Sequence, residues 1–385
     1  MRILILNYKH PAQEDAGGAE LYMLRLAQVL LRGQHEVTFF TAAVPDACAL
    51  DGVTGLRFLR FGTRYTVFGH AHRFLRKHPR DFDLVIDSVN HRSFAAHRIV
   101  GDRAIAIVHH LGRELWASEF APPLSWFGRY VAEPYFIHEL RGARLVAVSA
   151  STASDLRSVK LSVMALVPPA HDPPLVSRHG APDLHKPRIV FVGRLVNNKR
   201  PLLALRAFQL LRTRYPYATM EFVGDGYLRA EIEGMRAPGV TVHGHVDDLA
   251  KSTILSRATL LLVPSVREGW GIVVSEAAAH GVPTIGTDIP GLRDSVVQNE
   301  TGLLTADSPE AMCDAAVAVL GDPRRYAQMA AAAVERSRGM TWERCAREIL
   351  ALARKEGAVR CGVGGLALRA EPELEGSAKG GGEGL

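Results

Sequence analysis

The chain has 385 residues, of which 47% are hydrophobic and 22% are charged, and its formal net charge is +6. This length and composition suit two globular domains, each with its own core. The positive charge comes with no arginine-rich helix and no RNA-type aromatic motif, so it argues against a nucleic acid partner and suits acidic ligands such as nucleoside diphosphates, or an anionic membrane surface.

The cysteines are widely separated and show neither Cys-x-x-Cys nor Cys/His metal spacing: Cys48, Cys313, Cys345 and Cys361. We therefore expect reduced thiols in a cytoplasmic protein. The segment 1–6 is too short for a signal peptide, and no apolar run approaches the ~20 residues of a membrane span.

The chain opens with a strand–loop–helix–strand pattern. An apolar run over residues 2–6 predicts a buried strand, and helical periodicity follows over 21–30 before a second strand at 36–40. Gly17 and Gly18 lie in the loop between the first strand and the helix. Such a glycine loop suits phosphate, although it lacks the spacing of a dinucleotide fingerprint, and tight packing is the alternative explanation.

Residues 57–80 are basic throughout, with no acidic residue and with aromatic residues interleaved. The two interpretations are a solvated basic helix face and peripheral attachment to anionic lipid. Directly after this stretch, Asp81-Phe82-Asp83 resembles a metal-binding Asp-x-Asp motif. Because it immediately precedes an apolar strand, we interpret it as a strand flank, with a metal site as the alternative.

Further buried strands are predicted over 84–86 and 105–108, and His109 and His110 follow the second of them. Another strand over 146–149 leads into a helix, with Ser149 as its expected cap. Six prolines between 168 and 187 then predict an interdomain connection.

The second half repeats the strand–loop–helix pattern. A strand over 188–192 leads into a loop that carries Gly193, Arg194 and Lys199, and a helix begins near Pro201. A strand and glycine turn over 222–226 and a strand over 240–242 follow. Helices fill most of 309–352, and after residue 358 the glycine- and glutamate-rich chain is predicted to be disordered.

The most informative stretch runs from residue 258 to 283. An apolar strand stops at Pro264, a turn contains Glu268, and a helical pattern that begins after Gly271 contains Glu276. Loops at the carboxyl ends of parallel strands bind ligands in open α/β sheets. Eight helical steps span roughly 12 Å, about the length of a sugar–diphosphate–ribose unit, so Glu276 could meet ribose hydroxyls while Glu268 meets a sugar.

This stretch resembles the Glu-x7-Glu signature of glycosyltransferase family 4, whose members are retaining, nucleotide-sugar-dependent enzymes of the two-domain GT-B type. The resemblance implies that Glu268 contacts the donor sugar and Glu276 the ribose. It also implies that Arg194 and Lys199 bind the donor diphosphate. A histidine of this family contacts the donor sugar, which favours His109, with His110 as the alternative register. The other implied donor-binding residues are Gly17, Gly18, Gly193, Gly224, Val246, Gly269, Gly271, Ile272 and Val273.

The fold that we expect is α/β, with two Rossmann-like parallel-sheet domains facing a cleft. The expected parts are an acceptor domain (1–172), a linker (173–187), a nucleotide-sugar donor domain (188–340), a C-terminal helix that packs back on the first domain (341–358) and a disordered tail (359–385). The resemblance covers residues 1–355. The turn Pro168-Pro169-Ala170-His171-Asp172 departs from the usual family turn, which alters a connector only.

The expected reaction transfers a sugar from a nucleoside diphosphate sugar to an acceptor without metal or cofactor, because Arg194 and Lys199 neutralise the leaving diphosphate. Two other classes remain open. One is a nucleotide-sugar epimerase or hydrolase of the same architecture, which would turn over donor without acceptor. The other is a non-catalytic nucleotide-sugar-binding subunit. The sequence leaves the sugar and the acceptor open, and it favours UDP over GDP.

Overall fold

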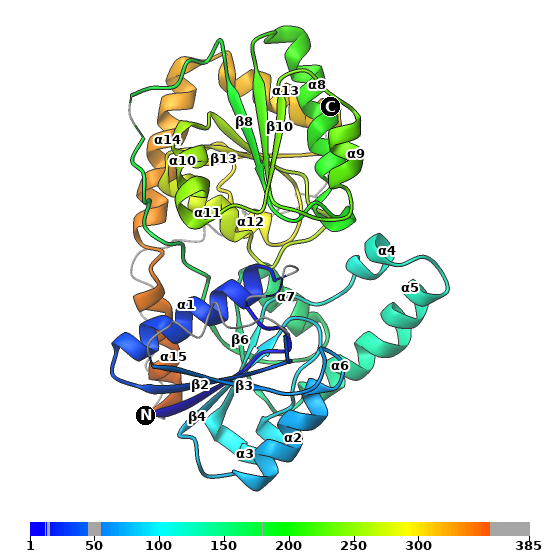
Figure 1. The fold of residues 1–385 in the computed structure, drawn as a ribbon, viewed down its shortest axis with the longest axis vertical. Coiled ribbons are helices and arrows are strands. Elements are labelled where there is room, and N and C mark those ends of the chain that lie inside the picture. The colour runs from blue at the N-terminus through cyan, green and yellow to red at the C-terminus, as the bar shows by residue number, and fades with distance from the viewer. Residues whose placement is uncertain (12, 14–15, 45–54, 179, 355–385) are drawn as a thin grey trace, which may run out of the picture.

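The computed structural model describes residues 1–354 except 12, 14–15, 45–54 and 179. Figure 1 shows two α/β domains stacked along the long axis of the molecule, each with helices on the faces of a central sheet. All strand pairs within the two sheets are parallel. The expected fold class, two Rossmann-like parallel-sheet domains, is confirmed.

The first domain is built on a seven-stranded sheet with the order β3-β2-β1-β4-β5-β6-β7. The strand order reverses beside β1, which lies between β2 and β4. The central strands are apolar because helices cover both of their faces. The strands are β1 (Arg2–Leu6), β2 (Glu36–Thr41), β3 (Leu56–Arg60), β4 (Leu84–Val89), β5 (Ala104–Val108), β6 (Arg144–Ala147) and β7 (Val163–Leu166).

The helices of the first domain include a long α1 that follows β1 and an arm made of α4, α5 and α6, which extends away from the sheet in Figure 1. Ser149 caps α7 as expected, because its Oγ accepts a hydrogen bond from the backbone N–H of Thr152 at 3.0 Å. The helices are α1 (Gly18–Arg32), α2 (Val67–Lys77), α3 (His97–Val100), α4 (Leu115–Glu119), α5 (Leu124–Phe127), α6 (Glu133–Glu139) and α7 (Ala150–Ser158).

The second domain has a six-stranded sheet with the order β10-β9-β8-β11-β12-β13, and its strand order reverses beside β8. Its strands are β8 (Arg188–Val192), β9 (Thr219–Val223), β10 (Val240–Gly244), β11 (Leu260–Val263), β12 (Thr284–Thr287) and β13 (Gly302–Thr305). Its helices are α8 (Pro201–Arg214), α9 (Arg229–Gly234), α10 (Asp248–Arg257), α11 (Ile272–Ala279), α12 (Leu292–Ser295), α13 (Pro309–Leu320) and α14 (Pro323–Arg338).

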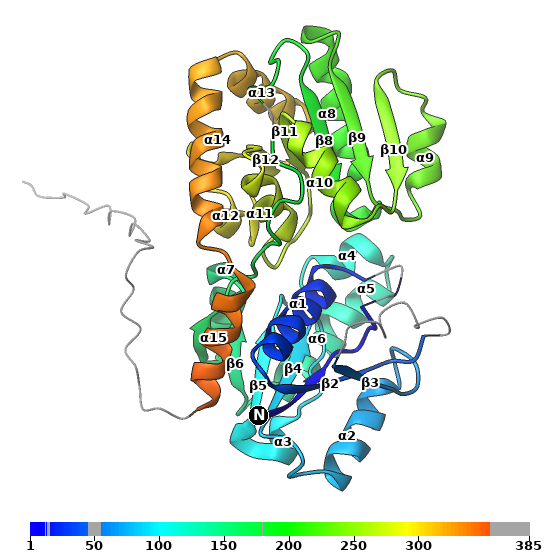
Figure 2. The same cartoon turned by 60° about the vertical axis from the view of Figure 1, so that its left-hand side comes forward.

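The last described helix, α15 (Trp342–Ala353), returns to the first domain and lies beside α1 (Figure 2). Its buried residues share a core with β1 and α1, and the Trp342 ring meets the Tyr22 ring edge-on at 5.5 Å. The chain therefore passes between the domains twice, at the proline-rich connection and between α14 and α15. The predicted tail (359–385) lies outside the described residues.

No helix in the described ranges is long and apolar enough to cross a bilayer. Residues 268–271 form a turn, and α11 begins at Ile272, so the helical rise does not set the separation of Glu268 and Glu276. The estimate of roughly 12 Å from eight helical steps therefore does not apply to the distance between Glu268 and Glu276.

Candidate active site

The strongest polar contact among the predicted site residues joins Lys199 to Glu268. The Lys199 Nζ lies 2.5 Å from Glu268 Oε1, and the Ser265 hydroxyl donates to the same oxygen at 2.7 Å. Lys199 follows β8 and Glu268 follows β11, so the pair lies at the carboxyl ends of the two adjacent strands where the second sheet reverses its order. Ligands of open α/β sheets bind at this point.

Arg194 lies in the same loop as Lys199 and is half-buried. Its guanidinium makes no hydrogen bond or ion pair with any residue in the described part of the chain, whereas its backbone carbonyl accepts one from the Val196 N–H at 3.0 Å. A half-buried guanidinium without a protein partner is available to an anionic ligand.

The glycine turns after β8 and β9 pack directly on each other. A Cβ atom at Gly224 would lie 2.1 Å from the Gly193 carbonyl oxygen, and the φ of Gly224 is +131°. The requirement for glycine at position 224 is therefore steric, and it keeps the Arg194 loop against the end of β9. Val246, after β10, is partly buried and packs against a hydrophobic core cluster of the second domain.

Glu276 lies on α11, and its Oε1 accepts a hydrogen bond from the Lys251 Nζ of α10 at 2.8 Å. Burial alone would lower the pKa of Lys251, but the carboxylates of Glu276 and Asp248 outweigh it and raise that pKa above its ordinary value. The charged pair fixes the Glu276 carboxylate, and one of its oxygens is not used by Lys251.

The first domain reaches this site at two places. A Cβ atom at Gly18 would lie 3.4 Å from Ile272 Cδ1, and one at Gly269 would lie only 2.3 Å from the His109 carbonyl oxygen. The start of α1 therefore contacts the start of α11, and the loop after β5 contacts the Glu268 turn. The Gly17 N–H donates to the buried Glu20 carboxylate at 2.8 Å, which fixes the start of α1.

The remaining predicted residues, Gly271 and Val273, belong to the same turn and helix. Gly271 adopts φ +85° immediately before α11, and Val273 is half-buried in the first turn of that helix.

The two histidines after β5 have different surroundings. The His109 side chain is buried, contacts the Tyr22 ring edge-on at 5.5 Å and lies 3.3 Å from the Ser88 hydroxyl. Burial lowers the pKa of His109 to about 3. His110 is half-buried, and burial lowers its pKa with further contributions from His91, Arg267, His109 and Lys199. The His110 ring meets the His91 ring edge-on at 5.0 Å.

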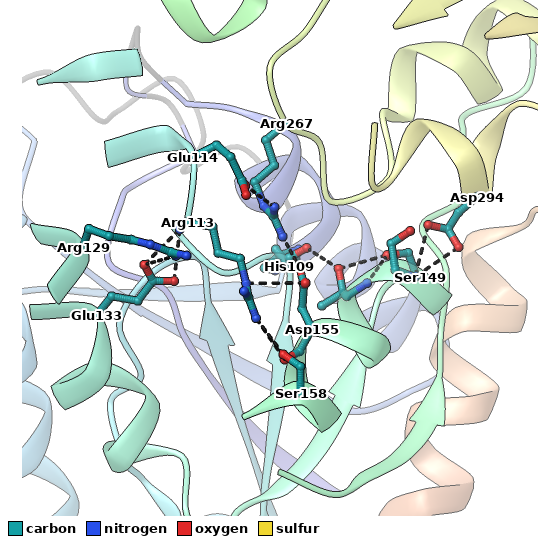
Figure 3. Close-up of polar contacts among 12 residues, drawn as sticks. His109, Arg113, Glu114, Arg129, Glu133, Ser149, Asp155, Ser158, Arg267 and Asp294 are labelled. Carbon is teal, nitrogen blue, oxygen red and sulfur yellow. Dashed lines mark hydrogen bonds and ion pairs between the residues drawn. The ribbon is translucent and has the colours of Figure 1, made fainter. Parts of the chain in front are cut away.

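The Glu268 turn is tied to the first domain by its neighbour Arg267, whose side chain is 3% exposed. Its guanidinium lies 2.5 Å from Glu114 and also pairs with Asp155, and both carboxylates belong to the first domain (Figure 3). Asp155 is also contacted by Arg113 at 3.4 Å. A buried charge one residue from Glu268 thus joins the two domains.

A second contact between the domains lies at the start of α7. The Asp294 carboxylate of α12 accepts hydrogen bonds from the backbone N–H groups of Ala150 at 3.0 Å and Ser151 at 3.2 Å (Figure 3). A carboxylate at a helix amino terminus satisfies free N–H groups and favours the helix dipole. In Figure 3, His109 lies between the Arg267–Glu114 pair and the Asp294 contact.

The Asp-x-Asp sequence lies away from these loops, at the amino end of β4. Asp83 accepts a hydrogen bond from the Arg2 backbone N–H at 2.7 Å, and Asp81 accepts one from His78 at 2.8 Å. Within the described ranges no group of three or more His, Cys, Asp or Glu side chains is placed to hold a metal ion. One hollow lies beneath the linker, lined by Arg178 and Tyr326 among others, and contains none of the predicted site residues.

Sequence reasoning missed Arg267, Lys251 and Asp294 as functional candidates. Arg267 had a usable signal, since it is a charge beside Glu268 in an otherwise apolar stretch. Lys251 had none, because one lysine on a polar helix is indistinguishable from a solvated residue.

Two family models match the chain. The model described as "Glycosyltransferase Family 4" matches residues 16–175, and the model described as "Glycosyl transferases group 1" matches residues 186–322.

The chain is also similar to curated proteins of two descriptions. The chain is 26% identical to the D-inositol 3-phosphate glycosyltransferase of Xylanimonas cellulosilytica, over 88% of this chain and 92% of that protein. It is 34% identical to the glycogen synthase of Mycobacterium tuberculosis over a shorter match, 38% of this chain and 37% of that protein.

Solved structures with the same fold include the sucrose-phosphate synthase of Thermosynechococcus elongatus, with a TM-score of 0.71, 21% identity, and coverage of 92% of this chain and 98% of that chain. Anabaena Alr3699/HepE in complex with UDP-glucose gives a TM-score of 0.69 at 15% identity, with coverage of 91% and 99%.

Proposed function

This chain belongs to glycosyltransferase family 4 and is a glycosyltransferase of GT-B architecture, and we propose that it transfers a sugar from a nucleoside diphosphate sugar with retention of the anomeric configuration and without a metal ion. The relative solved with UDP-glucose supports testing UDP sugars first.

The observation that carries this proposal is the Lys199–Glu268 pair at the switch point of the second sheet. A nucleoside diphosphate bound there would place its diphosphate against Lys199 and the partnerless Arg194, with the first turn of α11 behind it. Glu276, fixed by Lys251, would accept hydrogen bonds from the ribose. The sugar would then lie toward Glu268 and the loop after β5.

We assign the sugar-facing histidine as His110 rather than the initially favoured His109. The His109 side chain is held inside the first domain by Tyr22 and Ser88, whereas His110 is half-buried and its ring meets that of His91 at 5.0 Å. The His109 backbone still borders the site, because its carbonyl oxygen contacts Gly269.

In the proposed reaction the bond between the anomeric carbon and the donor phosphate oxygen breaks, and a new bond to an acceptor hydroxyl oxygen forms on the same face of the sugar. The acceptor proton passes to the leaving phosphate. Charge builds on the diphosphate as the bond breaks, and Lys199 and Arg194 are the groups that stabilise it. The Arg267 contacts hold the Glu268 turn against the first domain.

Two measurements on the whole chain test the proposal. In a thermal-shift panel of UDP, GDP and ADP with their sugars, one base should stabilise the protein, because a ligand at 100 times its Kd adds ~2.7 kcal/mol, equivalent to a few degrees. Turnover of that sugar with an acceptor should persist in excess chelator. Donor consumption without acceptor would instead identify a hydrolase or epimerase, and tight binding without turnover a non-catalytic subunit.

We also propose peripheral contact with anionic lipid through residues 57–80. The structure exposes Arg73, Arg76 and Lys77 of α2, while Phe74 packs against the domain core. The basic residues thus form an outward-facing charged surface. Salt-sensitive flotation with anionic vesicles tests this contact, since such attraction is screened within about 10 Å at 0.1 M salt.

A further inference from the structure

The arm between α4 and α6 has an outer surface made mainly of apolar and aromatic side chains. We call residues 120–135 the apolar arm. Every exposed residue in this range is apolar or aromatic, and the large ones are between 43% and 73% exposed: Phe120, Leu124, Trp126, Phe127, Tyr130, Val131 and Tyr135. Monomeric proteins rarely expose contiguous apolar patches of this kind unless the patch contacts a partner or a membrane.

Two buried carboxylates, Glu133 in the apolar arm and Glu139 just beyond it, attach the arm to the domain. Glu133 is buried, receives Arg129 at 3.1 Å and accepts a hydrogen bond from the Arg113 backbone N–H at 3.0 Å. Arg92 pairs with the buried Glu139 at 3.1 Å. The charges therefore orient the arm, and they leave its apolar side toward solvent.

The neighbouring helix α2 supplies the opposite chemistry. Arg92 lies over the Phe68 ring of α2 at 4.8 Å and over the Tyr135 ring of α6 at 6.0 Å, so the two helices meet across this side chain. Helix α2 exposes cations, and residues 57–80 contain no acidic residue. An apolar, Trp- and Tyr-containing surface next to a cationic helix complements an anionic bilayer, where aromatic rings occupy the headgroup region and cations meet lipid phosphates.

The arm also begins at the candidate site. Glu119, at the end of α4, accepts a hydrogen bond at 3.0 Å from the backbone N–H of Asn198, the residue before Lys199. Glu114, at the start of α4, pairs with Arg267. A molecule anchored in a bilayer at the arm would therefore lie near the loops that carry Lys199 and Glu268.

We propose that the apolar arm inserts into the interfacial region of an anionic bilayer and that the acceptor is a lipid-anchored hydroxyl compound delivered from that surface. The assignment of the acceptor rests on the proposed function. Membrane insertion of the arm does not, since it is independent of the chemistry of the site. The arm adds an attraction that salt does not screen to the salt-sensitive attraction of α2.

The test is flotation of the full chain with vesicles of phosphatidylcholine, alone or mixed with phosphatidylglycerol, at low and high salt. The variant Trp126→Ser/Tyr130→Ser should lower partitioning onto mixed vesicles about tenfold or more at both salt concentrations. The control Tyr217→Ser/Met235→Ser removes exposed apolar residues from the second domain and should leave partitioning unchanged. Neutralising α2 with Arg73→Gln/Arg76→Gln/Lys77→Gln should remove the preference for phosphatidylglycerol.

Equal partitioning of the arm variant and the wild type, or no binding by the wild type, would overturn the membrane proposal. A concentration-dependent dimer in light scattering that the arm variant abolishes would show that the arm pairs two copies, which also overturns it. Transfer to water-soluble acceptors as fast as to lipid acceptors in vesicles would overturn the acceptor assignment. Donor binding is measured separately without vesicles, so failure of the proposed function is seen there and not in the flotation.

Discussion

Replacing Arg267 with Met should loosen the contact between the two domains. The substitution keeps much of the side-chain volume but removes a charge that is 3% exposed and has two carboxylate partners. Breaking a buried ion pair typically costs ~3–5 kcal/mol. Asp155 keeps Arg113 at 3.4 Å, and the Glu114 side chain is 57% exposed and regains water. We therefore expect a loss near the lower end, about 3 kcal/mol.

The matched control is Arg338→Met, which removes an arginine that lies 2.5 Å from Glu335 but with side chains 69% and 72% exposed. An exposed pair of this kind contributes ~0.2–1 kcal/mol. Urea unfolding of both variants measures the difference, and about 3 kcal/mol corresponds to a midpoint shift of ~1 M at an m-value of ~3 kcal/mol/M. Adding Asp155→Asn to Arg267→Met should cost less than adding it to the wild type. Equal losses of unfolding free energy for the two arginine variants would refute the reasoning that the buried Arg267 ion pairs stabilise the contact between the domains.

Lys199→Ala should lower kcat as well as raise KM, by the ~2.7–4 kcal/mol typical of one preorganised donor; a raised KM with unchanged kcat in steady-state kinetics would show uniform binding instead. Glu276→Gln should weaken nucleoside diphosphate binding by about 1–3 kcal/mol, whereas Glu268→Gln should slow transfer and leave nucleotide affinity nearly intact; calorimetry that finds equal losses would reverse the assignment of the two ends. Turnover should survive chelation, and restoration by Mg²⁺ or Mn²⁺ of activity lost to chelator would reopen the metal question. Burial lowers the pKa of His109 from 6.5 to about 3, so between these pH values the unfolded chain binds a proton that the folded chain excludes. The free energy of unfolding should therefore fall as the pH drops through that window, and His109→Gln should flatten this dependence in urea titrations.

The sequence predicted the architecture because its main signals are local. The strands after residues 1, 83 and 187 are buried on both faces, so each reads as a short apolar run, and Gly193 marks where the third ends. The strand–turn–helix unit that contains Glu268 and Glu276 is contiguous in the chain, so its residues could be assigned from the sequence and the family resemblance.

Only the tertiary structure decided which of these residues meet. Lys199 and Glu268 are 69 residues apart and come together because β8 and β11 are neighbours in the sheet. Arg267 finds its partners 153 and 112 residues away, in the other domain. The different surroundings of His109 and His110 also needed the structure, because successive residues at a strand end point in different directions and only packing shows that the His109 side chain faces inward. The apolar arm is a fourth case, since an aromatic-rich segment reads from sequence as core, and only the position of the neighbouring elements leaves it exposed.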